Sequence, residues 1–179
     1  MSINEMLKDK RILCLCEGAA EYDIMNLLLE NELLIINKED LYDEKLHYRK
    51  RVRDIEDQFL GYSHQKELII LRVIDSKNEQ FNLKKAYANR YRVINIITNP
   101  EIEILIIIDK ADLDEFNKTK STKKASEFCK EKYKLRKIKK SGTMREYFND
   151  VRKLTAALKR HKSNYGKDIY TIYDLLQRT

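Results

Sequence analysis

The chain has 179 residues and a mass of 21.4 kDa, which suits one domain with a sizeable core better than two ordinary domains. Its 42% hydrophobic and 36% charged residues and net charge of +7 are typical of a soluble globular protein, and no apolar run approaches the roughly 20 residues that span a bilayer. With no signal-peptide pattern and three cysteines without a repeated spacing, we expect a cytoplasmic protein with no disulfide framework, zinc site or membrane partner.

The first predicted element is a strand at Arg11 to Cys16. It stops at Glu17-Gly18, and an amphipathic helix follows from about Ala19 to Leu34. A second carboxylate, Glu21, lies one helical turn after Glu17. An apolar strand therefore leads directly into two acidic side chains.

The next segment predicts a short strand at Leu33 to Ile36 and a charged helix from Arg49 to Leu60 that ends at Gly61. The clearest strand follows at residues 68–74, LIILRVI, which is almost wholly apolar and is typical of a strand buried on both faces. This strand also ends on a carboxylate, Asp75.

Residues 79–91 are predicted to be helical, and a further buried strand, RVINIIT, begins at Arg92 and runs into Asn99-Pro100. Alternating strands and helices predict an α/β fold with a parallel sheet. Ligands bind such sheets beyond the carboxyl ends of the strands. We therefore expect Glu17, Asp75 and the turn at residues 98–101 to meet at one edge.

The Ile-rich segment that starts at Asn99 is compatible with a strand, but its start favours a helix. Asn99 is a good N-cap, Pro100 suits the first helical position, and Glu101 and Glu103 fall in the first turn. Further helices are predicted at Lys118 to Tyr133, Met144 to Lys162 and Ile169 to Gln177, and the basic stretch KLRKIKKSG, residues 134–142, lies between the first two.

The charges divide the chain into an acidic and a basic part. Residues 1–116 hold 17 Lys or Arg against 23 Asp or Glu, whereas residues 117–167 hold 18 against four. Such a basic segment is typical of phosphate binding, although a solvated helical surface is the plainer alternative. We expect an α/β core at 1–116 and a basic helical extension at 117–179 packed on it.

Three segments in order, Leu13-CLC-Glu17-Gly18 with Glu21, Ile70-LRVI-Asp75 and Ile97-TNPEIE-Ile104, resemble the TOPRIM nucleotidyl-transfer and hydrolase superfamily. The last segment is most similar to the RloB-like branch, which is related to the nuclease parts of OLD-type phage-defence systems. The resemblance covers roughly residues 11–116 and implies a TOPRIM-like parallel sheet flanked by helices. By this resemblance Glu103 matches the family's helix glutamate.

The implied chemistry is cleavage of phosphodiester bonds with Mg²⁺ or Mn²⁺ held by carboxylates. Glu17 would hold a metal ion or act as general acid or base, Asp75 would be the principal metal ligand, and Glu21 would hold a water or a second ion. The family usually has Asp-x-Asp after the second strand, but this chain has Asp75-Ser76-Lys77. Either Glu79 or Glu103 supplies the missing carboxylate, or Lys77 binds phosphate in place of a cation, or metal-dependent catalysis is lost.

Several alternatives stay open at this point. A second alignment uses the run ending at Asp109, with Asp112-Leu113-Asp114 as the acid pair, and the acids at the strand ends are also compatible with helix capping. By the resemblance, the first functional hypothesis is a nuclease that acts on DNA or on structured RNA such as tRNA, in a bacterial antiviral defence system with an ATPase partner. The chain itself has no Walker motif, so we expect any ATPase activity to come from that partner. The others are a catalytically degenerate nucleic-acid-binding or regulatory subunit and a small primase-like or maturase-like enzyme. The expected nucleic-acid-binding residues are Lys77, Lys134, Arg136, Lys137, Lys139 and Lys140, and the oligomeric state is left open.

Overall fold

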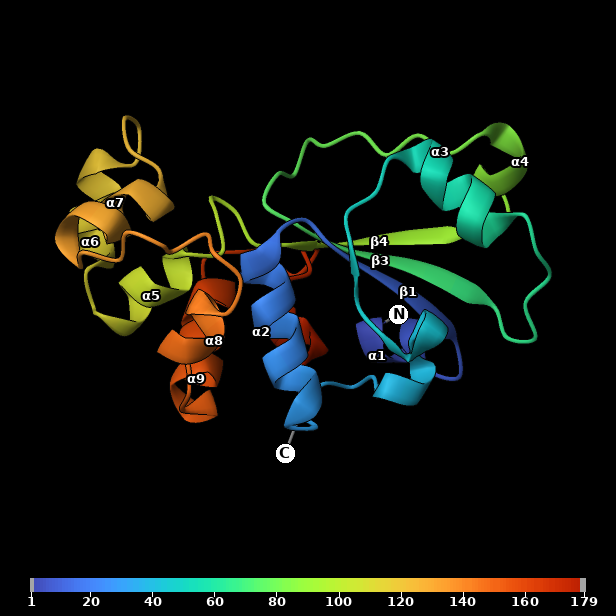
Figure 1. Cartoon of the computed structure of the whole chain (residues 1–179), viewed down its shortest axis with the longest axis horizontal. Helices are drawn as coiled ribbons and strands as arrows, with labels where there is room; N and C mark the ends of the chain where they lie inside the picture. The colour runs from blue at the N-terminus through green and yellow to red at the C-terminus, as the bar shows by residue number, and fades with distance from the viewer. Residues whose placement is uncertain (1, 178–179) are drawn as a thin grey trace.

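The computed structural model describes residues 2–177 and contains one four-stranded sheet (Figure 1). The strands are β1 (Arg11–Cys16), β2 (His47–Tyr48), β3 (Leu68–Ile74) and β4 (Arg92–Ile97), in the spatial order β2-β1-β3-β4. All neighbouring pairs are parallel. The predicted α/β class with a parallel sheet flanked by helices is therefore confirmed.

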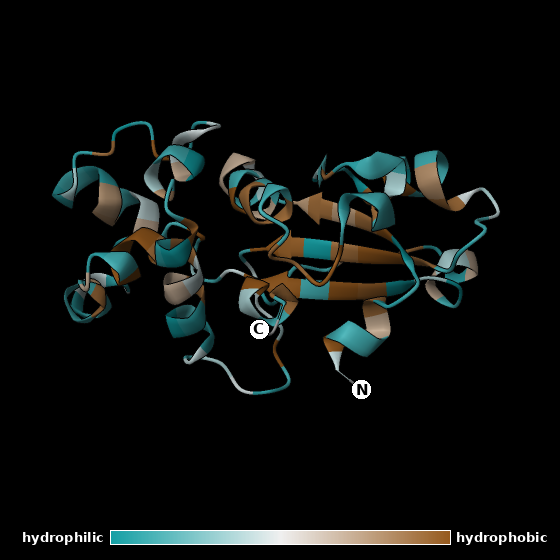
Figure 2. Ribbon diagram, turned by 90° about the horizontal axis from the view of Figure 1, so that it is seen from below, coloured by the Kyte–Doolittle hydropathy of each residue, from teal (hydrophilic) through white to brown (hydrophobic). Residues whose placement is uncertain are grey.

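The two central strands are buried on both faces, as their apolar sequences predict. Every residue of β3 is buried, as are all but the first of β1. The strands are brown along most of their length in the hydropathy view (Figure 2). In register, Cys16 of β1 pairs with Val73 of β3, so both strands end at the same edge of the sheet.

Each face of the sheet carries its own apolar core. On one face, α1 (Ile3–Leu7), α2 (Ala19–Glu30) and α9 (Val151–Lys162) contribute to a large cluster with β1, β3 and β4. On the other face, α3 (Val52–Ile55) and the π-helical turn η3 (Glu56–Leu60) form a smaller cluster with β1 and β3, and α4 (Lys85–Ala88) adds the partly buried ring of Tyr87.

The basic part of the chain is built from short helices that pack against the same large core. These are α6 (Leu113–Thr119), α7 (Ala125–Lys132), α8 (Thr143–Tyr147) and α9, and they follow the apolar helix α5 (Ile104–Asp109). Met144 of α8 and Leu154 of α9 belong to the cluster that contains Ile12 of β1. The core thus continues from the sheet into the basic part. None of the helices within residues 2–177 is long and apolar enough to cross a membrane.

The prediction of a second strand at Leu33 to Ile36 is wrong. Leu34 forms only an isolated antiparallel bridge with Leu176 near the other end of the chain. The free edge of β1 pairs instead with β2, where Leu15 lies opposite His47. Residues 38–40 and 42–44 form the short 3-10 turns η1 (Lys38–Asp40) and η2 (Tyr42–Glu44).

Four other predicted helices are shorter or interrupted. Of residues 79–91 only Lys85–Ala88 is helical, and the final segment forms only the 3-10 turn η4 (Ile172–Leu175). Of the helix predicted from Lys118, the first two residues end α6 (Leu113–Thr119), residues 120–124 form a turn, and the helix resumes only as α7 at Ala125. The predicted helix from Met144 is divided into α8 and α9 because Asp150 caps a new helix start at Arg152 N.

The helix predicted to begin at Pro100, with Asn99 as its N-cap, begins four residues later, at Ile104. Residues 99–103 form a turn in which the Asn99-Pro100 bond is cis, and Ile104 N and Leu105 N donate to carbonyls three residues earlier. Asn99 is therefore not an N-cap. Glu101 and Glu103 are buried rather than displayed in a solvated first turn, because other elements cover this turn.

The basic loop at residues 134–142 is fixed to the core at its end. Gly142 has a φ of 88°, in the left-handed region that favours glycine, and its N–H donates a 2.6 Å hydrogen bond to Asp23 Oδ2 of α2. Lys137 O in the same loop accepts from Thr143 Oγ1. These contacts hold the loop over the first turns of α2.

We expect Gly142→Ala to destabilise the protein by about 1 kcal/mol, because a Cβ in the left-handed region is strained. The added methyl group itself meets nothing within 4 Å, so the cost isolates the backbone conformation. Gly166→Ala is the matched control, since its Cβ also meets nothing within 4 Å and its φ lies outside the left-handed region. Urea denaturation of both variants measures the difference, and equal midpoints would contradict this account.

Candidate active site

A pocket of about 260 Å³ lies beyond the carboxyl ends of β1 and β3. Five carboxylates and one ammonium group line it, together with the backbone at the start of α2. The charged residues are Glu17, Glu21, Asp75, Glu101, Glu103 and Lys139. We call this hollow the acidic pocket. It brings together four residues that the sequence singled out, Glu17, Glu21, Asp75 and Glu103.

Glu17 joins the two central strands at the rim of the acidic pocket. Its N–H continues the ladder by donating to Val73 O at 3.0 Å, and its Oε2 accepts a 2.9 Å hydrogen bond from Asp75 N. Its other oxygen, Oε1, lies 2.7 Å from Nη1 of Arg49, the residue after β2. The carboxylate is thereby held in one orientation between three strands.

Glu21 enters the same pocket from the first turn of α2. Its Oε2 accepts a 3.1 Å hydrogen bond from Gly18 N, and a Cβ on Gly18 would lie 3.1 Å from this oxygen. Glycine therefore permits the close approach of backbone and carboxylate. Burial, with repulsion from Glu103, Glu17 and Asp75, raises the pKa of Glu21 to about 7.

Two further carboxyl groups of the pocket, those of Asp75 and Glu103, also have raised pKa values, which favours their neutral forms. Burial raises the pKa of Asp75, and the nearby carboxylates of Glu17 and Glu101 raise it further. Burial also raises the pKa of Glu103, with a contribution from Glu101 that Lys139 partly offsets. Acidic charge is thus crowded and incompletely neutralised in the pocket.

Glu101 is a buried member of the pocket that the sequence placed only in a helix start. It accepts a 2.9 Å hydrogen bond from Ser126 N of α7 and lies 2.7 Å from Lys139 Nζ. Burial alone would raise the pKa of Glu101, but the bonds from Lys139 and Ser126 outweigh burial and hold that pKa below its usual value. In the sequence, the one indication that Glu101 belongs to the site was its place in the turn directly after β4.

Other predicted site residues lie elsewhere. The Lys77 ammonium group sits 4.7 Å from the centre of the Tyr165 ring, and Lys77 does not line the acidic pocket. Of the basic loop, only Lys139 lines the acidic pocket. The remaining four are exposed at its surface: Lys134, Arg136, Lys137 and Lys140.

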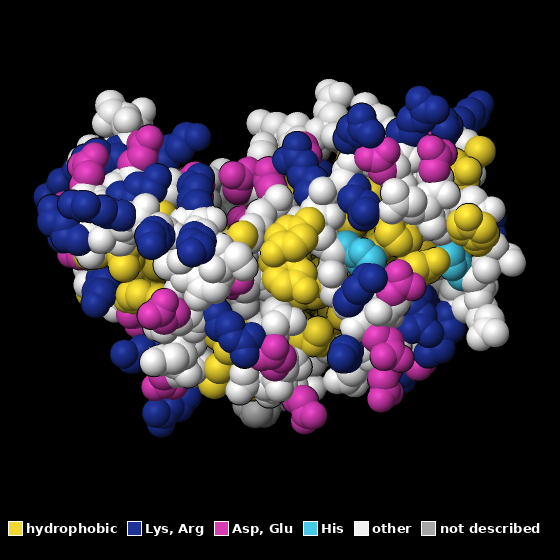
Figure 3. Space-filling model, in the orientation of Figure 1, with side chains coloured by type: hydrophobic (Ala, Val, Ile, Leu, Met, Phe, Trp, Pro, Cys, Tyr) yellow, Lys and Arg dark blue, Asp and Glu magenta, His cyan; other side chains and the backbone are white. Residues whose placement is uncertain are grey.

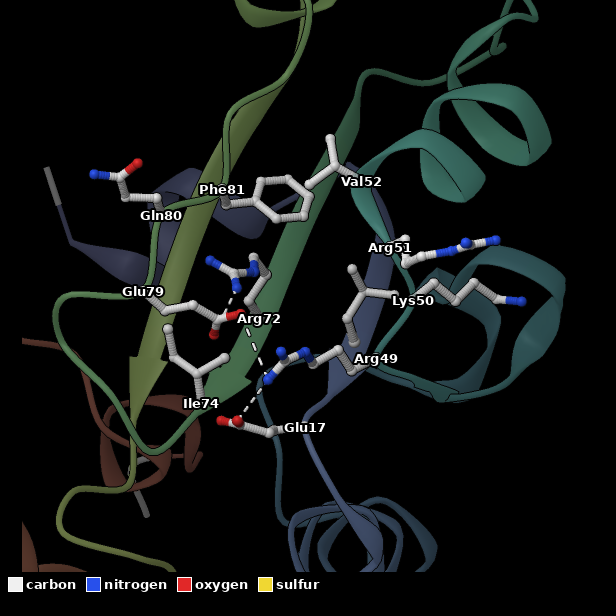
Figure 4. Close-up of a pocket in the computed structure, with 11 residues that line it drawn as sticks. Glu17, Arg49, Lys50, Arg51, Val52, Arg72, Ile74, Glu79, Gln80 and Phe81 are labelled. Carbon is white, nitrogen blue, oxygen red and sulfur yellow. Dashed lines mark hydrogen bonds and ion pairs between the residues drawn. The ribbon is translucent and has the colours of Figure 1, made fainter.

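Glu79 lines a second, neighbouring pocket of about 410 Å³, where its carboxylate lies 2.9 Å from Arg72 Nη2 and 3.5 Å from Arg49 Nη1 (Figure 4). Glu79 and Asp75 therefore line different pockets, and the position of Glu79 does not support the hypothesis that it completes the acid set around Asp75. Glu17 lines both pockets.

The alternative acid pair downstream is wrong, because the run that ends at Asp109 is the helix α5 and not a strand. Asp109 accepts a 2.7 Å hydrogen bond from Tyr147 Oη. Asp112 accepts one of 2.7 Å from Tyr133 Oη and pairs with Lys132. These acids therefore tie helices together.

Within residues 2–177, no three His, Cys, Asp or Glu side chains gather closely enough to form a metal cage. Mg²⁺, however, commonly binds through one or two carboxylates and keeps several waters. The metal donors that the acidic pocket offers are carboxylate oxygens. Two of these carboxylate residues, Glu17 and Asp75, are neighbours in it. The donor chemistry therefore fits a hydrated Mg²⁺ but not a fully protein-coordinated ion.

Comparisons of the chain with family models, with curated proteins and with solved structures found no match.

We expect Glu21→Gln to stabilise the protein increasingly as the pH rises. In the wild type the folded state keeps a proton on Glu21 up to about pH 7, whereas the unfolded chain loses it near pH 4.3. Between these values the folded state binds more protons, so wild-type stability falls with rising pH, by roughly 3–4 kcal/mol for this group. The Gln variant lacks this loss.

Urea denaturation at pH 4, 6 and 8 measures the effect. Glu39→Gln, at an exposed position in η1, is the control and should follow the wild type at each pH. A stability difference between Glu21→Gln and wild type that stays constant from pH 4 to pH 8 would show that Glu21 titrates normally.

Proposed function

We propose that the protein is a Mg²⁺-dependent phosphodiesterase of TOPRIM type that acts on nucleic acid. The observation that supports this most is the convergence of Glu17, Asp75 and Glu103 on one pocket, although they come from three separate parts of the chain. Carboxylates at the carboxyl edge of a parallel sheet are suited to hold a cation that neutralises a phosphate. Glu79 and Lys77 are not assigned to this catalytic set.

In this proposal Glu17 and Asp75 hold the metal ion, which when bound would neutralise the phosphate oxygens and activate a water. Glu21 supplies the proton for the leaving oxygen, because a carboxyl group with a pKa of about 7 is partly protonated at neutral pH. Lys139, which lines the same pocket and is more than half exposed, can contact the phosphate. Glu101 positions Lys139 there.

The basic part of the chain would hold the polymer against these acids. Lys and Arg side chains are concentrated over the lobe that carries α6 and α7 (Figure 3). A carboxylate site repels a polyanion, so nearby cations are needed to retain it. Phosphate contacts do not distinguish DNA from RNA, so we propose either DNA or structured RNA such as tRNA as substrate. By the resemblance alone, we also propose a role in antiviral defence with an ATPase partner.

A second function is favoured by a specific observation: cations of the protein already occupy part of the acid set. Arg49 contacts Glu17 at 2.7 Å and Lys139 contacts Glu101 at the same distance. Such internal neutralisation suits a nucleic-acid-binding or regulatory subunit that keeps the fold without metal-dependent catalysis.

We expect Glu17→Gln to abolish divalent-dependent cleavage, by at least 100-fold, while the protein stays folded, because the residue lies at a strand end rather than in the core. The assay uses supercoiled plasmid, single-stranded DNA and total tRNA with Mg²⁺ or Mn²⁺. Glu67→Gln, an exposed acid at the opposite end of β3, is the matched control and should cleave like wild type.

Titration calorimetry with Mg²⁺ and Mn²⁺ separates the two functions. Binding at millimolar metal that is lost in Glu17→Gln supports the phosphodiesterase. If wild type binds neither ion and cleaves none of the three substrates, the binding-subunit function stands instead.

Replacing Lys137, Lys139 and Lys140 together by Ala should weaken nucleic-acid binding to a similar extent on all sequences. Each lost phosphate contact should also flatten the slope of log affinity against log salt by about one unit. Fluorescence anisotropy from 50 to 300 mM salt gives the slope.

The control triple variant replaces Lys118, Lys120 and Lys130, which are exposed on α6, after it and on α7. If both triple variants flatten the slope equally, the loop has no special role. If neither changes it and a co-purifying acidic protein is lost from the first, the basic charge docks a protein partner.

A further inference from the structure

The second pocket, defined by the residues around Arg72 and Glu79, contains a buried guanidinium. Arg72 lies within β3 and is only 3% exposed. A charged side chain in a buried strand costs free energy that an apolar residue of similar size would not. Stability of the sheet therefore does not explain an arginine at this position.

The Arg72 guanidinium is held facing the pocket by its surroundings. Nη1 donates a 3.3 Å hydrogen bond to Asn95 Oδ1 on the neighbouring strand, and the guanidinium carbon lies 4.3 Å from the centre of the Phe81 ring. Arg49 follows β2 on the other side of β1, and its backbone N–H donates a 2.7 Å hydrogen bond to the backbone oxygen of Cys16. The guanidinium of Arg72, within β3, and that of Arg49, just after β2, therefore both reach the carboxylate of Glu79.

The carboxylate of Glu79 lies between these two groups (Figure 4). Glu79 belongs to the irregular segment between β3 and α4 rather than to either element. Its Oε2 is buried and 2.9 Å from Arg72 Nη2, yet it accepts no hydrogen bond of good geometry. The carboxylate therefore satisfies the charge of the guanidiniums but not their hydrogen-bonding directions.

A phosphate group matches this place better than a carboxylate does. Its tetrahedral oxygens can accept from two guanidiniums at once, and planar guanidinium forks are the preferred partners of phosphate. The pocket is large enough, at about 410 Å³, and four cations line it: Arg49, Lys50, Arg51 and Arg72. Lys50 and Arg51 point away from Arg72 in Figure 4, and Arg51 pairs with Asp54, so Arg49 and Arg72 are the cations that face Glu79.

We propose that this second pocket binds a phosphate of a nucleic-acid strand between Arg49 and Arg72, and that Glu79 occupies the place of this phosphate in the free protein. Because Glu17 lines both pockets, the strand would run from the phosphate site into the acidic pocket. The choice of a nucleic-acid strand rests on the proposed function. The phosphate site itself does not require cleavage.

The test is equilibrium binding in EDTA, where metal-dependent cleavage does not occur. A labelled single-stranded decanucleotide is titrated with protein, and inorganic phosphate is then used as competitor. We expect Glu79→Gln to bind the oligonucleotide roughly tenfold more tightly than wild type, because the competing charge is removed. Arg49→Gln should bind roughly tenfold more weakly.

The exposed ion pair Arg53–Asp57 on the same flank supplies matched controls, since neither residue lines the pocket. Asp57→Asn and Arg53→Gln remove the same charges, and each should change the affinity less than twofold. Arg72→Lys keeps the charge but loses the planar fork, and it should weaken binding provided that its thermal unfolding matches wild type.

Equal tightening by Glu79→Gln and Asp57→Asn would overturn the proposal, because net charge alone would explain it. Inorganic phosphate that binds but does not displace the oligonucleotide would also overturn it, since the site would then take a free anion. The proposed phosphodiesterase is tested by a different experiment, cleavage in the presence of Mg²⁺ or Mn²⁺. Absence of cleavage there would contradict the enzyme but would not change the binding result in EDTA.

Discussion

The parallel register of β1 and β3 is the constraint on which the site depends. It places Glu17 N opposite Val73 O and lets Asp75 N donate to the Glu17 carboxylate at 2.9 Å. A shift of one residue would turn the side chains of a strand to the opposite face. Gly18 then opens α2, so Glu21 follows into the same space. On the other side, Thr98 N donates to Ile74 O, which brings the turn containing Glu101 and Glu103 to this edge.

The acidic pocket is electrostatically unbalanced, and the protein resolves this in two ways. Arg49 and Lys139 neutralise Glu17 and Glu101 by direct contact. The remaining acids are held closer to their neutral forms, because burial raises the pKa of Glu21, Asp75 and Glu103. A core built for stability alone would avoid such crowding. Perturbed carboxyl groups in a hollow at a sheet edge are typical of sites where a cation or a proton is exchanged.

The sequence was sufficient for the elements that long apolar patterns define. Strands β1, β3 and β4 and the start of α2 lie where hydrophobic runs and the Glu17-Gly18 junction predicted them. It was insufficient where tertiary contacts decide. Asn99 and Pro100 form a good helix start in isolation, but the turn is covered by Ser126 and Lys139 from elsewhere, so the helix begins later. The role of Glu79 depended on Arg49 and Arg72, whose proximity only the fold reveals.

Arg49 physically links the two pockets, because the same Nη1 atom contacts Glu17 at 2.7 Å and Glu79 at 3.5 Å. An anion that displaces Glu79 would compete with Glu17 for this guanidinium. Loss of that contact would leave the Glu17 carboxylate less neutralised and therefore a better ligand for a cation. A cation at Glu17 would in turn release Arg49 towards an anion. By linkage each event favours the other, so a polyanion and a metal ion would bind this edge of the sheet cooperatively.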